Sequence, residues 1–483
     1  MLKAAAVDQE SLSLMKQRAE ELLEQRGVTI DHTELCQALA DKGCIVDGTL
    51  VRFPRNLILQ AVNAVPARFT LFSPSDKYNL SFPHPSGGFY TRTNTGAPNF
   101  RDADGNVHPF TLQEAEDWFT LANSLPNIDF VALPSVAASE DVPAQAVDLY
   151  ALNRALHVSE KHIWVQPYET ESVQGLIDLS AAAAGGLDEL RRRPIVSFIA
   201  CSVPLLSFKH MDAEILLRCA QAGIPVQPCS LPTAGANAPV TAQGTALVCC
   251  TEVLAMIVML ELLCPGLPVI ATPLPFSMDM MTTYSLQSAP EITLCRTLCM
   301  QFFEEGYNIR AHTYATGTDS LTSDGQSLIE RTSLAHILAL SGGSVLGGAG
   351  QIETAKTNCP LTLITDDEIF GIAQRFRQGL VVDDETMDVE ELFGNPEELE
   401  DGFITTEHTL RHYKEFTRPA LFSRVGVSAW KEAGRPTFED RVRTRYDELT
   451  AHPVRRKLSA DINAALDDAF QKAVAAVCTN ERN

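Results

Sequence analysis

Short runs of apolar residues recur along this chain from Gly87 onward, and amphipathic segments separate them. Each run is a few residues long and rich in β-branched and aromatic side chains, which is typical of strands buried on both faces of a sheet. We identify eight such runs: Phe89 to Thr93, Ile128 to Leu133, Ile163 to Gln166, Ile195 to Cys201, Ile224 to Pro228, Pro268 to Thr272, Asn308 to Thr313, and Ser344 to Gly348.

Helical spacing of apolar residues characterises the longer segments between these runs. They include Thr111 to Ser124, Ala144 to Ser159, Met211 to Ala222, Ala242 to Leu263, Glu291 to Gly306, and Asp324 to Leu340. Strands that alternate with helices in this way lie parallel to one another. Eight repeats over about 260 residues favour a closed barrel over an open doubly wound sheet. The predicted fold class is α/β, a (β/α)8 TIM barrel with an N-terminal helical cap and a C-terminal helical extension.

The two ends of the chain have other patterns. Residues 1–86 predict a cap of helices, Ser11 to Arg26 and His32 to Lys42, followed by a hairpin of Phe69 to Phe72 with Tyr78 to Phe82. The barrel is expected over residues 87–380, and a helix from Asp366 to Gln378 ends it. Residues 381–483 predict an extension with an acidic stretch, Asp383 to Asp401, and a terminal helix, Asp461 to Val477. These added helices suit a homo-oligomer, a dimer or larger.

One stretch, Leu231 to Glu291, combines a loop, a long helix capped by Thr241, a buried strand and a second loop. Both loops are expected at the same end of the sheet. The second contains Phe276, Met278, Asp279, Met280, Met281 and Tyr284. A loop that simply connects two elements would be more polar, so this pattern indicates a site.

Composition narrows the possible partners. The chain has 483 residues, a formal charge of −23 and 45% hydrophobic residues. This charge argues against nucleic acid and anionic membranes as partners and suits a cationic small molecule. Met1 to Gln25 contains five acidic residues and no targeting pattern, and Glu252 and Glu261 interrupt the most apolar helix, so we expect a cytoplasmic location. The 12 cysteines lack C-x-x-C spacing, which predicts reduced thiols.

The active site of such a barrel lies at the carboxyl ends of its strands. The polar and aromatic candidates there are Asn94, Gln166, Tyr168, Ser202, Gln227, Cys229, Phe276, Asp279, His312, Tyr314, Asp319, Gln351 and Glu353. Many of these side chains are expected to satisfy loop backbone instead of binding a substrate.

Motifs for other chemistries are absent from the sequence, including G-x-S-x-G, H-E-x-x-H, the P-loop and a G-x-G-x-x-G after a strand. The glycine-rich segment Gly342 to Gly350 lies where barrels often bind phosphate, but it lacks nearby Lys or Arg, and small residues also permit close packing. Cys201, His210 and Cys229 do not have the spacing of a zinc site. We therefore predict no metal.

Several motifs in a fixed order resemble the trimethylamine methyltransferase (MttB) superfamily: APVTAQG, then PGLPVI, then DMMT with SAPE after it. The resemblance extends from about Asn94 to Arg418. It implies a TIM barrel that moves a methyl group from an amine to the cobalt of a separate corrinoid protein, with no tightly bound cofactor of its own. The founding branch uses pyrrolysine, which this sequence lacks, so the chain resembles the non-pyrrolysine branch. Members of that branch demethylate quaternary amines such as glycine betaine, proline betaine and carnitine.

The implied reaction agrees with the missing motifs. A quaternary nitrogen leaves as a neutral amine, so no general acid or base is needed; the nucleophile would be Co(I) of the partner. The barrel would hold the methyl group in line and bind the onium on aromatic faces, for which Tyr90, Tyr168, Phe276 and Tyr314 are candidates. His312, Asn94 and backbone N–H groups near Gly350 could bind a carboxylate. Gln227, Asp279, Gln351 and Glu353 complete the candidate substrate-binding set.

Glycine betaine is the first substrate hypothesis. Proline betaine, carnitine and γ-butyrobetaine remain alternatives within the same family. Two hypotheses from other classes also stay open at this point, a non-catalytic barrel that binds an onium compound and a metal-dependent hydrolase or lyase.

Overall fold

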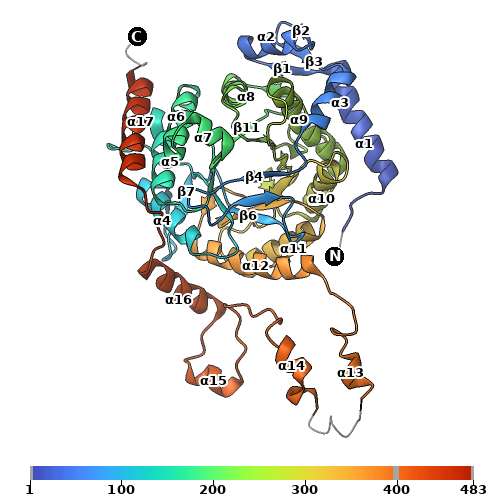
Figure 1. The fold of residues 1–483 in the computed structure, drawn as a ribbon, viewed down its shortest axis with the longest axis vertical. Helices are drawn as coiled ribbons and strands as arrows, with labels where there is room; N and C mark the ends of the chain where they lie inside the picture. The colour runs from blue at the N-terminus through green and yellow to red at the C-terminus, as the bar shows by residue number, and fades with distance from the viewer. Residues whose placement is uncertain (1–3, 395–401, 480–483) are drawn as a thin grey trace.

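A closed barrel of eight parallel strands forms the centre of the computed structural model, which describes residues 4–394 and 402–479 (Figure 1). Its strands are β6 (Tyr90–Thr93), β9 (Phe130–Ala132), β10 (His162–Val165), β11 (Val196–Cys201), β13 (Val226–Ser230), β15 (Thr272–Pro273), β18 (His312–Tyr314) and β19 (Val345–Ala349). They pair in sequence order, β6 pairs with both β9 and β19, and a parallel bridge between Ala271 and Ala311 joins β15 to β18. All eight predicted strands form, and the TIM-barrel prediction is confirmed.

Eight helices surround the barrel: α4 (Leu112–Asn123), α5 (Val147–Val158), α6 (Val173–Ala184), α8 (His210–Ala222), α9 (Ala242–Leu263), α10 (Pro290–Glu304), α11 (Gly325–Leu340) and α12 (Pro360–Gln378). Thr111 begins α4 with a capping box to Glu114, and Thr241 caps α9 as predicted. Within the described residues, α9 is the helix that is long and apolar enough to cross a membrane, but 89% of its most apolar window is buried inside the molecule. It is a core helix of the barrel.

The N-terminal residues form a small layer beside α9. Helix α1 (Gln9–Glu21) continues into a π-helical turn (Leu22–Arg26), and α2 (Thr33–Asp41) and α3 (Arg55–Ala64) follow. Three short strands, β1 (Val28–Ile30), β2 (Ile45–Asp47) and β3 (Leu50–Arg52), form a sheet that β12 (Ser207–Phe208) extends from a barrel loop. The sequence indicated α1 and α2 but not α3 or this sheet.

A hairpin closes the amino-terminal end of the barrel. Its strands are β4 (Phe69–Leu71) and β5 (Leu80–Phe82), which confirms the predicted hairpin. Leu71, Leu80 and Phe82 join the apolar cluster inside the barrel, and the Phe72 amide donates to Pro194 O, 2.9 Å away, just before β11. Figure 1 shows β4 lying across the barrel.

Shorter elements cover the opposite end, where the strands terminate. β14 (Thr233–Ala234), β16 (Phe276–Met278) and β17 (Ser285–Leu286) form one small sheet. β7 (Asn99–Arg101), β8 (Val107–Pro109), β20 (Gln351–Ile352) and β21 (Thr357–Asn358) form another. The short helix α7 (Leu187–Arg192) is not part of this end, because it lies between α6 and the start of β11. We call this carboxyl end of the barrel the mouth.

Beyond α12 the chain leaves the barrel. Residues 380–394 and 402–435, which we call the arm, contain α13 (Val389–Leu392), α14 (Glu407–His412) and α15 (Val427–Glu432) and extend away from the barrel in Figure 1. Helices α16 (Phe438–Ala451) and α17 (Ala460–Thr479) return to it, and α17 packs on α5 and α6. The predicted terminal helix is therefore confirmed. Residues 395–401 of the acidic stretch lie outside the described residues.

Candidate functional site in the barrel

Three side chains from three strands meet halfway along the barrel interior: Arg92 on β6, Trp164 on β10 and His312 on β18. The Arg92 guanidinium stacks on the Trp164 ring, with Cζ 3.4 Å from the ring centroid. Its Nε donates to His312 Nε2 at 3.0 Å, and its Nη1 donates to Thr93 O at 2.8 Å. The His312 and Trp164 rings meet edge to face at 5.0 Å. We call these three residues the donor cluster.

A glycine permits this close packing. A Cβ atom at position 347 of β19 would lie 2.2 Å from His312 Nε2 and 3.0 Å from the Arg92 side chain, closer than real contacts allow. The glycine at position 347 is therefore explained by close packing, which was the alternative to phosphate binding for this glycine-rich segment.

Burial controls the charge of the donor cluster. It lowers the pKa of His312 well below the usual value, and the positive charges of Arg92 and Arg296 lower it further. His312 is therefore neutral at pH 7. Because its Nε2 accepts a hydrogen bond from Arg92, the proton belongs on Nδ1. Burial also lowers the pKa of Arg92, to about 10, so this guanidinium remains charged at neutral pH.

Closer to the mouth lie Tyr314, Phe276 and Arg296. Tyr314 follows His312 by two residues and its ring meets the His312 ring at 6.1 Å, while burial raises the pKa of its hydroxyl. Arg296 reaches inward from α10, donates to Tyr314 O at 3.3 Å and to Pro275 O at 3.1 Å, and lies 5.7 Å from the Phe276 ring. Phe276 is 9% exposed. Aromatic faces and two guanidinium groups therefore share this part of the barrel.

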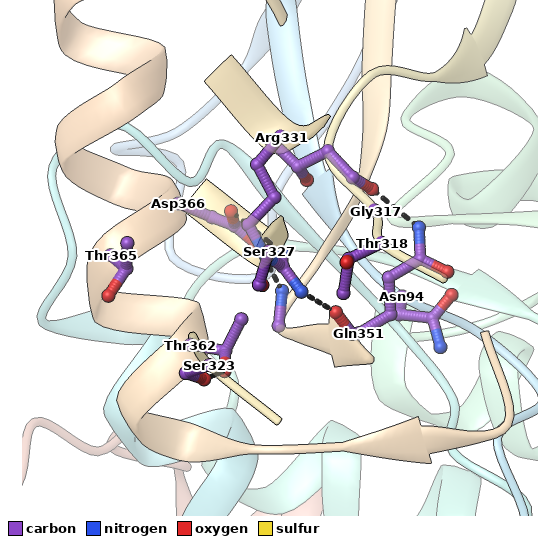
Figure 2. Close-up of polar contacts among 12 residues, drawn as sticks. Asn94, Gly317, Thr318, Ser323, Ser327, Arg331, Gln351, Thr362, Thr365 and Asp366 are labelled. Atoms are coloured by element: carbon purple, nitrogen blue, oxygen red, sulfur yellow. Dashed lines mark hydrogen bonds and ion pairs between the residues drawn. The ribbon is translucent and has the colours of Figure 1, made fainter. Parts of the chain in front are cut away.

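A polar network supports one side of the mouth (Figure 2). Arg331 of α11 and Asp366 of α12 form a fully buried ion pair, with Nη1 2.9 Å and 2.7 Å from the two carboxylate oxygens. Arg331 also donates to Ser327 Oγ and to Gln351 O, and Asp366 accepts from the Gly350 amide at 2.7 Å. The Gln351 side chain donates to Thr316 O at 2.5 Å. This network fixes the turn that follows β19.

Asn94 and Gln351 lie on this side of the mouth and Tyr314 lies deeper. Asn94 Nδ2 donates to Asn358 Oδ1 at 2.9 Å. Tyr168 lies after β10, where its amide donates to Asp148 Oδ2 at 2.9 Å and burial raises the pKa of its hydroxyl. Glu353 accepts from Thr357 Oγ1 at 2.8 Å, a local contact within the β20–β21 turn.

Other predicted candidates lie apart from this group. Tyr90 begins β6 at the closed end, and its hydroxyl donates to Ser81 O at 3.1 Å and accepts from the Ser81 amide at 2.9 Å. Gln227 donates to Ser197 Oγ at 2.7 Å, below the mouth. Asp279 orders the turn between β16 and β17 by accepting from the Met281 amide at 2.9 Å and from Thr282 Oγ1 at 2.7 Å.

Several weaker candidates have structural contacts. Ser202 donates to Glu252 of α9 at 2.6 Å, and Asp319 accepts the amides of Gln287 and Ser288 at 2.8 Å and 3.0 Å. Cys201 and Cys229 lie opposite each other on β11 and β13. His210, in contrast, stacks on His32 at 4.6 Å, outside the barrel. Over residues 4–394 and 402–479, no group of three or more His, Cys, Asp or Glu could hold a metal ion.

Sequence reasoning missed Arg92, Trp164 and Arg296. Most candidates were taken from the carboxyl ends of strands or from the loops after them, whereas Arg92 and Trp164 lie within strands that were correctly predicted. An arginine within a run buried on both faces was the available signal, because such a charge needs a partner inside the barrel.

Comparison with known proteins agrees with this architecture. A family model described as trimethylamine methyltransferase (MTTB) matches residues 2–477. The chain is 24% identical over 466 residues to trimethylamine methyltransferase MttB of Desulfitobacterium hafniense, covering 93% of this chain and 90% of that protein. It is 26% identical over 451 residues to a glycine betaine methyltransferase of the same species, covering 92% of each.

Solved structures show the same fold. The monomethylamine methyltransferase (MtmB) of Methanosarcina barkeri superposes with a TM-score of 0.53 at 12% identity, covering 99% of this chain and 90% of that one. Because the family model matches nearly the whole chain, this protein belongs to the trimethylamine methyltransferase (MttB) family of methyltransferases.

Proposed function

We propose that this chain transfers a methyl group from a quaternary amine to the Co(I) ion of a separate corrinoid protein, which would supply the nucleophile. The observation that carries the proposal is the protonation of the barrel centre. His312 is neutral and is an acceptor for Arg92, while Tyr314 has a raised pKa, so both are poor proton carriers at pH 7. A quaternary nitrogen departs without gaining a proton, so its demethylation suits such a centre.

The aromatic side chains near the mouth support binding of an onium group. Phe276 lies on β16, which follows β15, and Tyr314 lies on β18. Both side chains are buried. A cation over such faces gains up to about 2 kcal/mol when water is excluded. The net charge of −23 favours a cationic substrate over long distances. Glycine betaine is the first choice, with proline betaine, carnitine and γ-butyrobetaine as alternatives within the same proposal.

The corrinoid partner would dock on the mouth. Exposed apolar residues surround it on four separate loops: Val203, Leu205, Val240, Met280, Met281, Tyr284 and Leu321. Met281, at 93% exposure, is the most prominent. Apolar side chains gathered on one face indicate a surface that another protein covers. All 12 cysteines are free, which agrees with the reducing cytoplasm that Co(I) would require.

A second copy of this chain would cover the arm. Large apolar side chains of the arm are exposed, among them Phe393 at 86% and Phe416 at 76%. Asp383 to Asp401 contains ten acidic and no basic residues, whereas residues 407–435 contain six Lys and Arg against three Asp and Glu. The two halves of the arm thus have opposite charge, which brings Glu385 and Arg411 together within one chain and would also complement a second copy. The corrinoid partner must leave after each transfer, so a permanent cover is better provided by a homo-oligomer.

An anaerobic assay tests the proposed reaction. A corrinoid protein held as Co(I) is mixed with this enzyme and one amine, and methyl-Co(III) is followed in the visible spectrum. We expect methylation with one or more quaternary amines and none with trimethylamine. Phe276→Ala should raise the KM for the amine about tenfold while kcat for methyl transfer changes little. Absence of methylation from every quaternary amine, beside an active control methyltransferase, would contradict the proposal.

A further inference from the structure

The donor cluster has more hydrogen-bond donors than acceptors. Three buried N–H-bearing atoms in it have no partner: Arg92 Nη2, Trp164 Nε1 and His312 Nδ1. The side chains that carry them touch one another, and all three are fully buried. A buried donor without an acceptor typically costs about 1–3 kcal/mol, and more if it is charged. The cluster therefore lacks acceptors for these three atoms, and above all an anionic one.

The charge of the cluster is also uncompensated. Among the described residues, no carboxylate lies within 4.0 Å of the Arg92 guanidinium. The other groups that favour its charged form are Tyr314, whose hydroxyl also interacts with the guanidinium, and Cys229; both are neutral at pH 7 because burial raises their pKa, so neither supplies a counter-ion. Arg296, also fully buried, adds a second positive charge; the carboxylate that acts on it, Asp319, already accepts two backbone amides.

Arg331 provides the comparison within the same fold. It is as buried as Arg92, yet Asp366 pairs with it and every one of its nitrogens has a partner. A buried guanidinium without a carboxylate is strongly unfavourable. The fold thus supplies a counter-ion for Arg331 and leaves Arg92 without one, at the centre of the proposed active site.

We infer that the donor cluster binds a carboxylate of the substrate, through Arg92 Nη2 with His312 Nδ1 as a second donor, so that the substrate is a zwitterion. This inference rests on the proposed function and specifies its substrate class. The anionic end lies deep, at Arg92, and the trimethylammonium end lies at Phe276 and Tyr314. The methyl group then faces the mouth, where the partner docks. Trimethylamine and choline lack the group that Arg92 binds.

The test compares ligands that differ in the carboxylate alone. Binding to the purified full-length enzyme is measured by calorimetry for glycine betaine against choline, and for γ-butyrobetaine against 4-hydroxybutyl-trimethylammonium. Acetate serves as a carboxylate without an onium group. We expect at least one carboxylate to bind ten- to a hundredfold more tightly than its alcohol, as a charge-assisted contact predicts. Arg92→Gln should reduce this ratio to near one and leave binding of the alcohol within about twofold.

Two further variants separate recognition from folding. Arg92→Lys keeps the charge and should retain part of the preference for carboxylate, whereas Arg296→Gln should reduce it less than Arg92→Gln does. Thermal melting checks that each variant is folded. Equal binding of carboxylate and alcohol by the wild type would overturn the inference. So would equal weakening of both ligands by Arg92→Gln, or failure to bind any carboxylate, acetate included.

The same samples distinguish this inference from the proposed function. Methyl transfer to Co(I) without preference for carboxylates would leave the reaction standing and overturn the zwitterion. Carboxylates that bind through Arg92 but donate no methyl group would support the anion site and overturn the reaction.

Discussion

Asp366 shows at the scale of one residue how the polar side of the mouth is held. Its carboxylate accepts from Arg331 and from the Gly350 amide, and both of its contacts are inaccessible to water. Gly350 has a φ of 86° and a Cβ there would meet the Trp118 ring at 2.2 Å, so this turn cannot shift to find other partners.

We therefore expect Asp366→Asn to destabilise the fold by about 3–5 kcal/mol, because it leaves the Arg331 charge buried without a counter-ion. Urea unfolding followed by circular dichroism measures this difference. Glu385→Gln is a suitable control, since it removes an exposed carboxylate that pairs with Arg411 and should leave the unfolding midpoint unchanged. A variant as stable as the wild type would show that the ion pair does not hold this turn.

At the scale of elements, the hairpin of β16 and β17 belongs to the mouth but not to the barrel interior. Its tip exposes Met280, Met281 and Tyr284, while Asp279 fixes its turn. We expect Met281→Asp to raise the KM for the corrinoid protein about tenfold or more, because a charge replaces an apolar contact at the interface. Methyl transfer to free cobalamin should not change. If both acceptors were affected equally, the hairpin would act on the substrate site and not on docking.

The elements that the sequence predicted well are those that bury a continuous apolar run. All eight barrel strands follow this pattern, because neither side of a barrel strand faces solvent, and so do seven of the eight surrounding helices; α6 was not identified. The strands β1 to β3 were missed because each has only three residues, too few to establish an alternating pattern, and α3 was missed as well. The hairpin β4–β5 was predicted, but not its position across the barrel, because long-range packing has no local signal.

Alternation along β6 relates the missed Arg92 to two residues that were predicted, Tyr90 and Asn94. Side chains alternate in a strand, so Tyr90, Arg92 and Asn94 point to the same face at different depths. The pattern gives the shared face, and the depth decides function: Tyr90 lies at the closed end, Arg92 at the centre and Asn94 at the mouth. Arg296 was beyond such reasoning, since it reaches the barrel from a helix whose register against the strands is set by packing.

At the scale of the whole molecule, the arm carries many of the exposed large apolar side chains among the described residues. We expect the protein to be a dimer or larger by light scattering after size exclusion. Phe393→Ser combined with Phe416→Ser should shift it toward monomer, because apolar contacts between copies are lost. Val107→Ser, an exposed apolar residue on β8 away from the arm, should not. If the mass of the double variant were unchanged, the arm would not form the contact between copies of this chain.

The hairpin that closes the amino-terminal end of the barrel also constrains the order of events in time. With that end sealed, amine, product and partner would all use the mouth. The corrinoid protein can then not be docked while an amine enters or leaves, so turnover would follow a compulsory order in which the amine binds first and the methylated partner leaves first. High concentrations of the corrinoid protein should therefore slow the initial rate, because the protein would dock on enzyme that has no amine bound and block the mouth. Saturating amine should relieve that inhibition.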